Sequence, residues 1–348
     1  MIPGYFIAVV SVYSIVFCIG FAGNVWLILT LVLIRIDKKQ PVTSNFKRMN
    51  QYLLSLSVSD LLVLCMIPML VSYFINGGWK LGFVMCKVFW TVENVNKLLS
   101  VAILTIMSVE RYMGICKPFN QHIGKQHNIV YLLLTTVVVT FFLCLPIIYY
   151  SETMHHDILT ENGSVLEVKV SCNSHVPDEI LPFFILYMFV FGFVVPVILI
   201  TGTSVFIVRR VRRNIGSIRR HSPLLSRPNR VIRSISSVVV FHFACWTPFW
   251  LAVLLTLTST AQLADFLTVS PKTLALVRMV TSFLPYINSA GNWIFYAALN
   301  RRIQSTSREV RERHERQSVS NNDASAVIIR ALSITRSMKK SFRSTSME

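Results

Sequence analysis

Residues 83–115 read FVMCKVFWTVENVNKLLSVAILTIMSVERYMGI, and this stretch decides the fold. It exceeds the roughly 20 mainly apolar residues with which a helix crosses the roughly 30 Å hydrocarbon core of a bilayer. Lipid does not accept ionisable groups, so those inside this stretch must face the interior of a helix bundle. The ionisable Glu93 and Lys97 share one helix face with the polar Asn96 and Ser100, at the spacing i, i+3, i+4, i+7.

Six further apolar runs predict a bundle of seven transmembrane helices, an all-α fold class, over residues 1–299. The chain is 53% hydrophobic and 14% charged, whereas a soluble chain carries about 25% charged residues. A short cytoplasmic amphipathic helix is expected at 300–317, and a disordered tail at 318–348. The predicted spans are residues 5–35, 48–75, 83–115, 127–150, 180–208, 231–258 and 274–299.

Charges between the spans predict the orientation. Residues 209–233 hold nine arginines and no acid, whereas residues 151–179 hold six acids and a single lysine. Basic loops stay on the cytoplasmic side, which places the N-terminus outside a multi-pass protein of the plasma membrane. The net charge of +18 therefore indicates membrane anchoring and not nucleic-acid binding. Asn162, in an Asn-Gly-Ser sequon, falls outside, where it is an expected glycosylation site.

The seven cysteines contain no C-x-x-C pair, which argues against a zinc site. Only Cys86 and Cys172 lie where loops should face outside, and this suggests one disulfide. No nucleophile–base set or cluster of metal ligands points to an enzyme.

Asp60 lies inside the second span, where a lone carboxylate needs a cation or a proton. A sodium ion would satisfy it, because hard cations prefer oxygen ligands. The candidate oxygens are those of Asp60, Asn96, Ser100 and Asn292. For the asparagine and serine side chains, hydrogen bonds that only hold the helices together are the alternative.

Short motifs, in order along the seven spans, resemble the rhodopsin-like family of G-protein-coupled receptors over about residues 10–303. The fold expected from this resemblance is the same seven-helix bundle, and the expected activity is signalling to a heterotrimeric G protein. The motifs are Gly23-Asn24-Val25, Leu56-Ser57-Val58-Ser59-Asp60, Trp79, Cys86 with Cys172, Glu110-Arg111-Tyr112 with Pro118, Pro146, Pro196, Cys245-Trp246-Thr247-Pro248, and Asn288-Ser289 with Asn292-Trp293-Ile294-Phe295-Tyr296.

The resemblance implies that Arg111 is held at rest by Glu110 and is released to meet the G protein. An always-charged guanidinium beside a carboxylate can serve as such a two-state switch. The switch would comprise Glu110, Arg111, Tyr112, Phe119 and Tyr296. The resemblance also implies a sodium pocket made of Asp60, Asn96, Ser100, Trp246, Asn288, Ser289 and Asn292.

Several residues depart from the family's pattern, among them Ser204, which replaces a fifth-helix tyrosine, and Thr135 or Thr136, which stands at a fourth-helix tryptophan position. Trp293 stands where proline is usual, so the last helix is expected to bend less. Pro228 replaces an acid that latches Arg111 to the sixth helix, and His242 replaces a phenylalanine below the sixth-helix tryptophan.

Glu93 lies where amine receptors carry an aspartate that binds the ammonium of the ligand. Lys97, one turn away, is expected to pair with it and to disfavour a small amine. The acidic outer loop would steer a cationic peptide to the protein. The pattern around Glu93, Asn96 and Pro68 is most similar to the somatostatin, opioid and allatostatin group of peptide receptors. The predicted ligand-binding residues are Glu93, Asn94, Lys97, Trp246, Phe249, Trp250, Arg278 and Tyr286.

The expected partners are an extracellular neuropeptide, a G protein for which the basic loop is compatible with the inhibitory class, and membrane lipid. Serines and threonines in the tail would recruit receptor kinases and arrestin after phosphorylation. The alternatives are a small-amine receptor and an ion-conducting or transport protein, although the absence of an internal repeat argues against a transporter.

Overall fold

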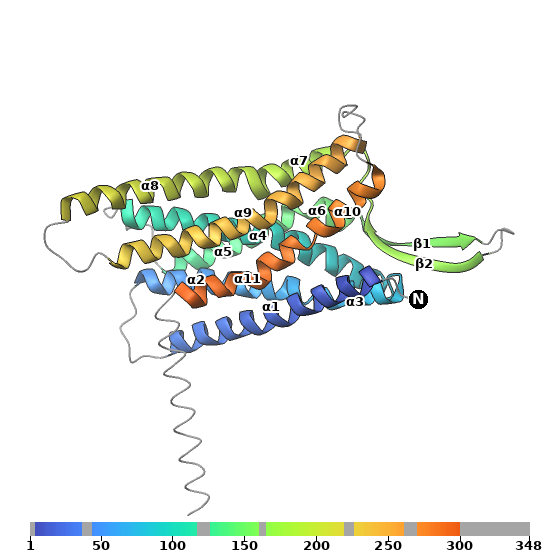
Figure 1. The fold of residues 1–348 in the computed structure, drawn as a ribbon, viewed down its shortest axis with the longest axis horizontal. Helices are drawn as coiled ribbons and strands as arrows, with labels where there is room; N and C mark the ends of the chain where they lie inside the picture. The colour runs from blue at the N-terminus through green and yellow to red at the C-terminus, as the bar shows by residue number, and fades with distance from the viewer. Residues whose placement is uncertain are drawn as a thin grey trace, which may run out of the picture. The chain divides into compact units, whose positions relative to one another are not determined.

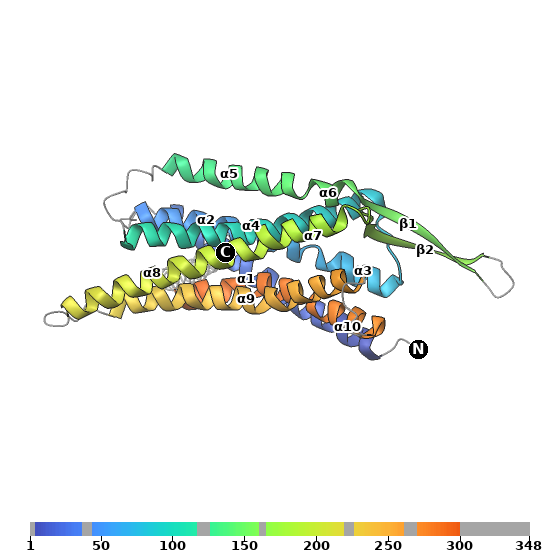
Figure 2. The same cartoon turned by 90° about the horizontal axis from the view of Figure 1, so that it is seen from above.

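A computed structural model describes residues 4–36, 44–116, 126–159, 165–218, 226–260 and 270–299. These residues form seven helical segments that lie side by side (Figures 1 and 2). In chain order they are α1 (Gly4–Ile36); α2 (Ser44–Leu64) with α3 (Ile67–Asn76); α4 (Gly82–Cys116); α5 (Gln126–Leu143) with α6 (Leu145–Tyr149); α7 (Leu181–Phe189), the π-helical turn η2 (Val190–Val194) and α8 (Val195–Ile218); α9 (Ser226–Thr260); and α10 (Pro271–Thr281) with α11 (Leu284–Leu299). The predicted helical bundle is confirmed.

Five of these segments are long and apolar enough to cross a membrane by themselves. The α5 segment has a shorter apolar stretch, Ile129–Leu143, and the last segment is divided between α10 and α11. Large apolar side chains such as Phe142, Phe183 and Val240 are exposed on the outside of the bundle, where acyl chains would cover them. The outside is therefore apolar while several polar side chains are buried within, as expected for a protein that has lipid as its solvent.

The breaks within the segments occur at prolines, because proline lacks a backbone N–H and cannot continue the ladder of helical hydrogen bonds. Pro68, Pro146 and Pro285 each lie in the first turn of the helix that follows a break. Pro196 follows the π-helical turn, and Pro248 lies inside α9. These positions let a segment change direction without leaving the bundle.

The outer loop contains a β-hairpin that the sequence analysis did not predict. Strands β1 (Ser151–Leu159) and β2 (Val165–Ser174) pair antiparallel, and they extend from the end of the bundle at which the N-terminus lies (Figure 1). The predicted disulfide is present: Cys86 in α4 is bonded to Cys172 in β2, with 5.6 Å between their Cα atoms. The Trp79 backbone N–H also donates to the Val170 carbonyl at 2.7 Å. The hairpin is thus fixed to the rim of the bundle.

Four predictions concern parts of the chain outside the described residues. These are the glycosylation of Asn162, the role of Phe119, the helix at 300–317 and the tail at 318–348.

Candidate functional site

An ion pair on α4 lies near the end of the bundle that carries the hairpin. The Lys97 ammonium is 3.1 Å from Oε1 of Glu93, and the two side chains are only 11% and 19% exposed. Lys97 Nζ also lies 5.3 Å from the ring centroid of Phe249 in α9. Because shielding from water strengthens the attraction between opposite charges, this pair should hold more firmly than an exposed one. The distance between the two charged groups confirms the predicted Glu93–Lys97 pair.

Aromatic rings extend from this pair into the bundle. Phe249 meets Trp246 and Trp250 nearly edge-on, each at 5.5 Å between ring centroids. Both tryptophans are buried, and their indole N–H groups have no hydrogen-bond partner among the described residues. The structure thus brings together five predicted pocket residues, two charged and three aromatic.

The other three predicted pocket residues are placed differently. Asn94 is buried and donates its amide to the backbone of its own helix at 2.8 Å, and Arg278 is exposed on α10. Tyr286 packs edge-on against Tyr13 of α1, with 5.7 Å between their ring centroids. Tyr13 was not predicted, because a single phenol in an apolar span does not indicate which helix it contacts.

A second polar cluster surrounds Asp60, whose side chain is fully buried. The Asn292 amide donates to Oδ2 of Asp60 at 2.9 Å. Asn24 of α1 donates to the Ser289 carbonyl at 3.1 Å. These contacts join α1, α2 and α11 deep in the bundle.

Oδ1 of Asp60 and Oδ1 of Asn292 remain without partners among the described residues. So do Oδ1 and Nδ2 of Asn288, which lies one turn before Asn292 in α11. Three buried oxygens, one of them anionic, are the kind of ligands that a hard cation prefers. Trp246 can only contribute an indole donor or an apolar wall to this cluster, because its nitrogen cannot bind a cation.

Asn96 has hydrogen-bond partners of its own, whereas Ser100 donates a hydrogen bond and keeps the lone pairs of its hydroxyl oxygen. Oδ1 of Asn96 accepts hydrogen bonds from the hydroxyls of Ser59 at 2.6 Å and Ser100 at 3.1 Å. A carbonyl oxygen has two lone pairs, so these two donors leave none on Asn96 for an ion. This arrangement matches the alternative of hydrogen bonds that hold α2 and α4 together. Ser59 was not singled out by the sequence analysis, because an isolated serine in an apolar span gives little indication of its partner.

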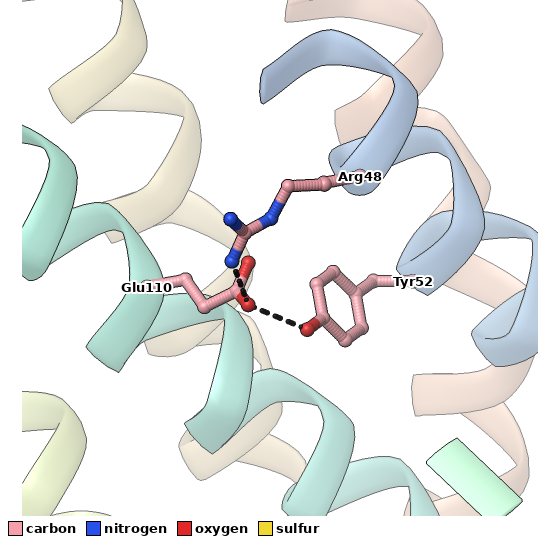
Figure 3. A network of polar contacts seen from close by, with 3 residues as sticks. All are labelled: Arg48, Tyr52 and Glu110. Carbon is pink, nitrogen blue, oxygen red and sulfur yellow. Dashed lines mark hydrogen bonds and ion pairs between the residues drawn. The ribbon is translucent and has the colours of Figure 1, made fainter. Parts of the chain in front are cut away.

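At the opposite end of α4, the Glu110 carboxylate contacts two side chains of α2 (Figure 3). Oε1 of Glu110 forms an ion pair with Arg48 and accepts a hydrogen bond from the Tyr52 hydroxyl at 2.7 Å. Arg111 Nη2 lies 3.5 Å from Sδ of Met49. Arg48 is thus a partner of Glu110 that was not predicted, and the expected restraint of Arg111 by Glu110 stays a prediction.

The remaining switch residues are only partly described. The Tyr112 ring lies 5.8 Å from that of Phe206, and this contact joins α4 to α8. The side chain of Tyr296 lies outside the described residues, as does all of Phe119.

Residues 23–296 match the family model "7 transmembrane receptor (rhodopsin family)". A probable G-protein coupled receptor of Caenorhabditis elegans is 28% identical over 307 residues, which cover 86% of this chain and 67% of the relative. Neuropeptide receptor 18 of the same organism is 26% identical over 310 residues, covering 84% of this chain and 64% of that receptor. Somatostatin receptor type 4 of Rattus norvegicus is 28% identical over 300 residues, covering 84% and 70%. The chain thus spans about two thirds of the length of these relatives, and its family match covers most of its own length. This chain belongs to the rhodopsin family of seven-transmembrane receptors.

Proposed function

We propose that this chain is a plasma-membrane receptor for an extracellular neuropeptide and that it signals through a heterotrimeric G protein, without enzymatic activity. Its N-terminus and the β-hairpin would face outside. Two of the relatives are a neuropeptide receptor and a somatostatin receptor, which supports a peptide ligand. Receptor kinases, arrestin and membrane lipid are the further proposed partners.

The Glu93–Lys97 ion pair is the observation that supports a peptide, and not a small amine, as the ligand. A small amine would have to replace the Lys97 ammonium, which already lies 3.1 Å from the Glu93 carboxylate. Such a ligand would gain little binding free energy, because its ammonium only replaces the charge contact that Lys97 already makes with Glu93. A peptide also contacts the outer rim and the hairpin, and these contacts offset the loss of the internal pair.

A panel of neuropeptides and small amines, applied to cells that express the receptor, tests this proposal. The readout is G-protein activation, with mock-transfected cells as the control. We expect a response to at least one peptide and to no amine. Activation by amines alone, or ion flux without G-protein activation, would contradict it.

Replacing Lys97 with methionine is expected to admit small amines. Methionine keeps much of the length of the side chain but leaves the Glu93 carboxylate without its internal cation, so a ligand ammonium can pair with it. We expect phenethylamine to bind the variant about tenfold more tightly than the unmodified receptor, a difference of about 1.4 kcal/mol. The measurement is the thermal shift of purified receptor against phenethylamine concentration. The matched control is Glu93→Gln/Lys97→Met, which lacks the carboxylate and should lose the gain.

We further propose that a sodium ion binds in the polar cluster around Asp60. The unpartnered oxygens of Asp60, Asn288 and Asn292 would hold it, and the ion would supply the positive charge that the buried carboxylate lacks.

Replacing Asp60 with asparagine is expected to remove a sodium-dependent gain in melting temperature. In the unmodified receptor, sodium chloride should raise the melting temperature by about 2–4 °C over choline chloride at equal ionic strength, because an ion that binds only the folded state stabilises it. Asp178→Asn removes an exposed acid outside the bundle and should keep this gain. An equal sodium shift in Asp60→Asn would exclude the site.

A further inference from the structure

A cavity of about 380 Å³ lies between α1 and α2, at the end of the bundle away from the hairpin. Its volume falls within the range of roughly 300–1,000 Å³ that is typical of small-molecule sites. Leu31 and Leu54 line its part further inside the bundle, while Arg35 and Lys47 line it close to the ends of their helices. The cavity is therefore amphipathic, with cations at the membrane surface and apolar walls behind them.

Two amides in the cavity wall have oxygens that need a donor. Oδ1 of Asn50 and Oε1 of Gln51 are buried, and neither has a hydrogen-bond partner among the described residues. A buried acceptor without a donor is unfavourable, because it has lost its hydrogen bonds to water. Both oxygens could accept hydrogen bonds from a ligand that carries several donors.

Among the residues that the structure describes, the two cations of the cavity have no acidic neighbour. No acid appears among its described lining residues, and the ion pairs of the described residues, Arg48–Glu110 and Lys97–Glu93, involve neither Arg35 nor Lys47. Both side chains are exposed at the helix ends. They can therefore bind an anion without breaking an existing ion pair among these residues.

We propose that this cavity binds the headgroup of an inositol phospholipid. Arg35 and Lys47 would pair with its phosphate, and its ring hydroxyls would donate to Asn50 and Gln51. The adjoining outer face of α1 exposes Leu29, Val32 and Leu33, along which acyl chains can lie. Basic pockets between transmembrane helices on the cytoplasmic side bind such headgroups, and the proposed orientation puts this cavity on that side. A serine headgroup fits less well, because its single ammonium would lie beside two cations.

Melting temperatures of the full-length receptor in lipid nanodiscs test the proposal. A thiol-reactive dye can report unfolding, because Cys144 and Cys245 are buried free cysteines. Four conditions are compared: phosphatidylcholine alone, phosphatidylcholine with phosphatidylinositol bisphosphate, phosphatidylcholine with phosphatidylserine of equal total charge, and phosphatidylcholine discs with soluble inositol trisphosphate. We expect the inositol lipid to raise the melting temperature by about 2–4 °C over the serine lipid.

Variants separate the headgroup contacts from general attraction to an anionic membrane. Arg35→Gln/Lys47→Gln should lose the shift, and because both side chains are exposed these changes leave the packing intact. Asn50→Leu should reduce the melting-temperature shift caused by the inositol lipid to that caused by the serine lipid. The control Arg209→Gln/Arg210→Gln removes the same charge from an exposed part of α8 outside the cavity and should keep the shift.

Three results would overturn the proposal. They are equal shifts with the inositol and serine lipids, an undiminished shift in Arg35→Gln/Lys47→Gln, and an equal shift with soluble inositol trisphosphate, which would assign the site to a free phosphate. If Asn50→Leu fails to fold, the double variant Arg35→Gln/Lys47→Gln, in which both changed side chains are exposed, still tests the proposal. Neither the peptide ligand nor the G protein is needed, so failure here leaves the proposed function untouched.

Discussion

Replacing Arg111 with alanine is expected to abolish G-protein signalling while ligand binding and surface expression persist. The Glu110 carboxylate is bound by Arg48 and Tyr52 of α2, so removing the Arg111 side chain leaves that network in place. Arg111 is half-buried at the end of α4 away from the hairpin, where a G protein would bind. The fold should therefore survive, and only the proposed contact with the G protein is lost.

The matched control is Arg48→Ala, which removes the arginine that pairs with Glu110 and keeps Arg111. Arg111 would then be the one cation that the family resemblance assigns to Glu110 at rest. We expect this variant to respond to ligand but to signal less without it. G-protein activation and radioligand binding in the same cells separate the two effects. Signalling by Arg111→Ala at the level of the unmodified receptor would refute the switch role, and a rise in basal signalling in Arg48→Ala would refute the role of α2.

The pairing of Glu110 shows what the sequence alone could not predict. Glu110 and Arg111 are adjacent in a helix, and adjacent residues point in different directions around the axis. Arg48 and Tyr52 are four residues apart, so they lie on one face of α2, and the packing of that face against α4 brings them to Glu110. Which face of α2 turns toward α4 depends on the whole bundle, and no local pattern records it.

Local patterns predicted the features that depend on local chemistry. The spans were predicted well because the apolar length needed to cross a bilayer can be counted directly. The Glu93–Lys97 pair was also predicted, because residues at i and i+4 of one helix must be neighbours. The hairpin was missed although Val168, Val170 and Cys172 alternate with polar residues in β2. This two-residue period covers only a few residues of a loop whose main feature is its six acids, so it is a weak signal for a strand.

The last helix combines a prediction from sequence with a contact that only the structure reveals. Trp293 stands where the family has proline, and it lies inside α11. The indole meets Trp26 of α1 at 6.2 Å between ring centroids. It also covers Gly23, where an added Cβ would lie 2.0 Å from its Nε1 atom. The glycine and the tryptophan are thus complementary in size.

Replacing Gly23 with alanine is expected to destabilise the receptor strongly and to lower its surface expression. The new methyl group would overlap the Trp293 indole and push α1 away from α11, and overpacking of this kind costs about 1–3 kcal/mol. Gly202→Ala in α8 is the matched control, because an added Cβ there meets nothing within 4 Å. Alanine favours a helix over glycine by about 1 kcal/mol, so this control should be neutral or slightly more stable.

The double variant Gly23→Ala/Trp293→Ala tests whether the clash is the cause. Removing the indole leaves room for the new methyl group, so Gly23→Ala should lower the melting temperature less in the Trp293→Ala background than in the unmodified receptor. The melting temperatures of the four receptors form a cycle that isolates the coupling between the two positions. If Gly23→Ala melts like Gly202→Ala, or costs the same with and without Trp293, then α1 and α11 do not depend on this contact. Strong coupling would mean that the tryptophan which replaced the family's proline requires a glycine opposite it.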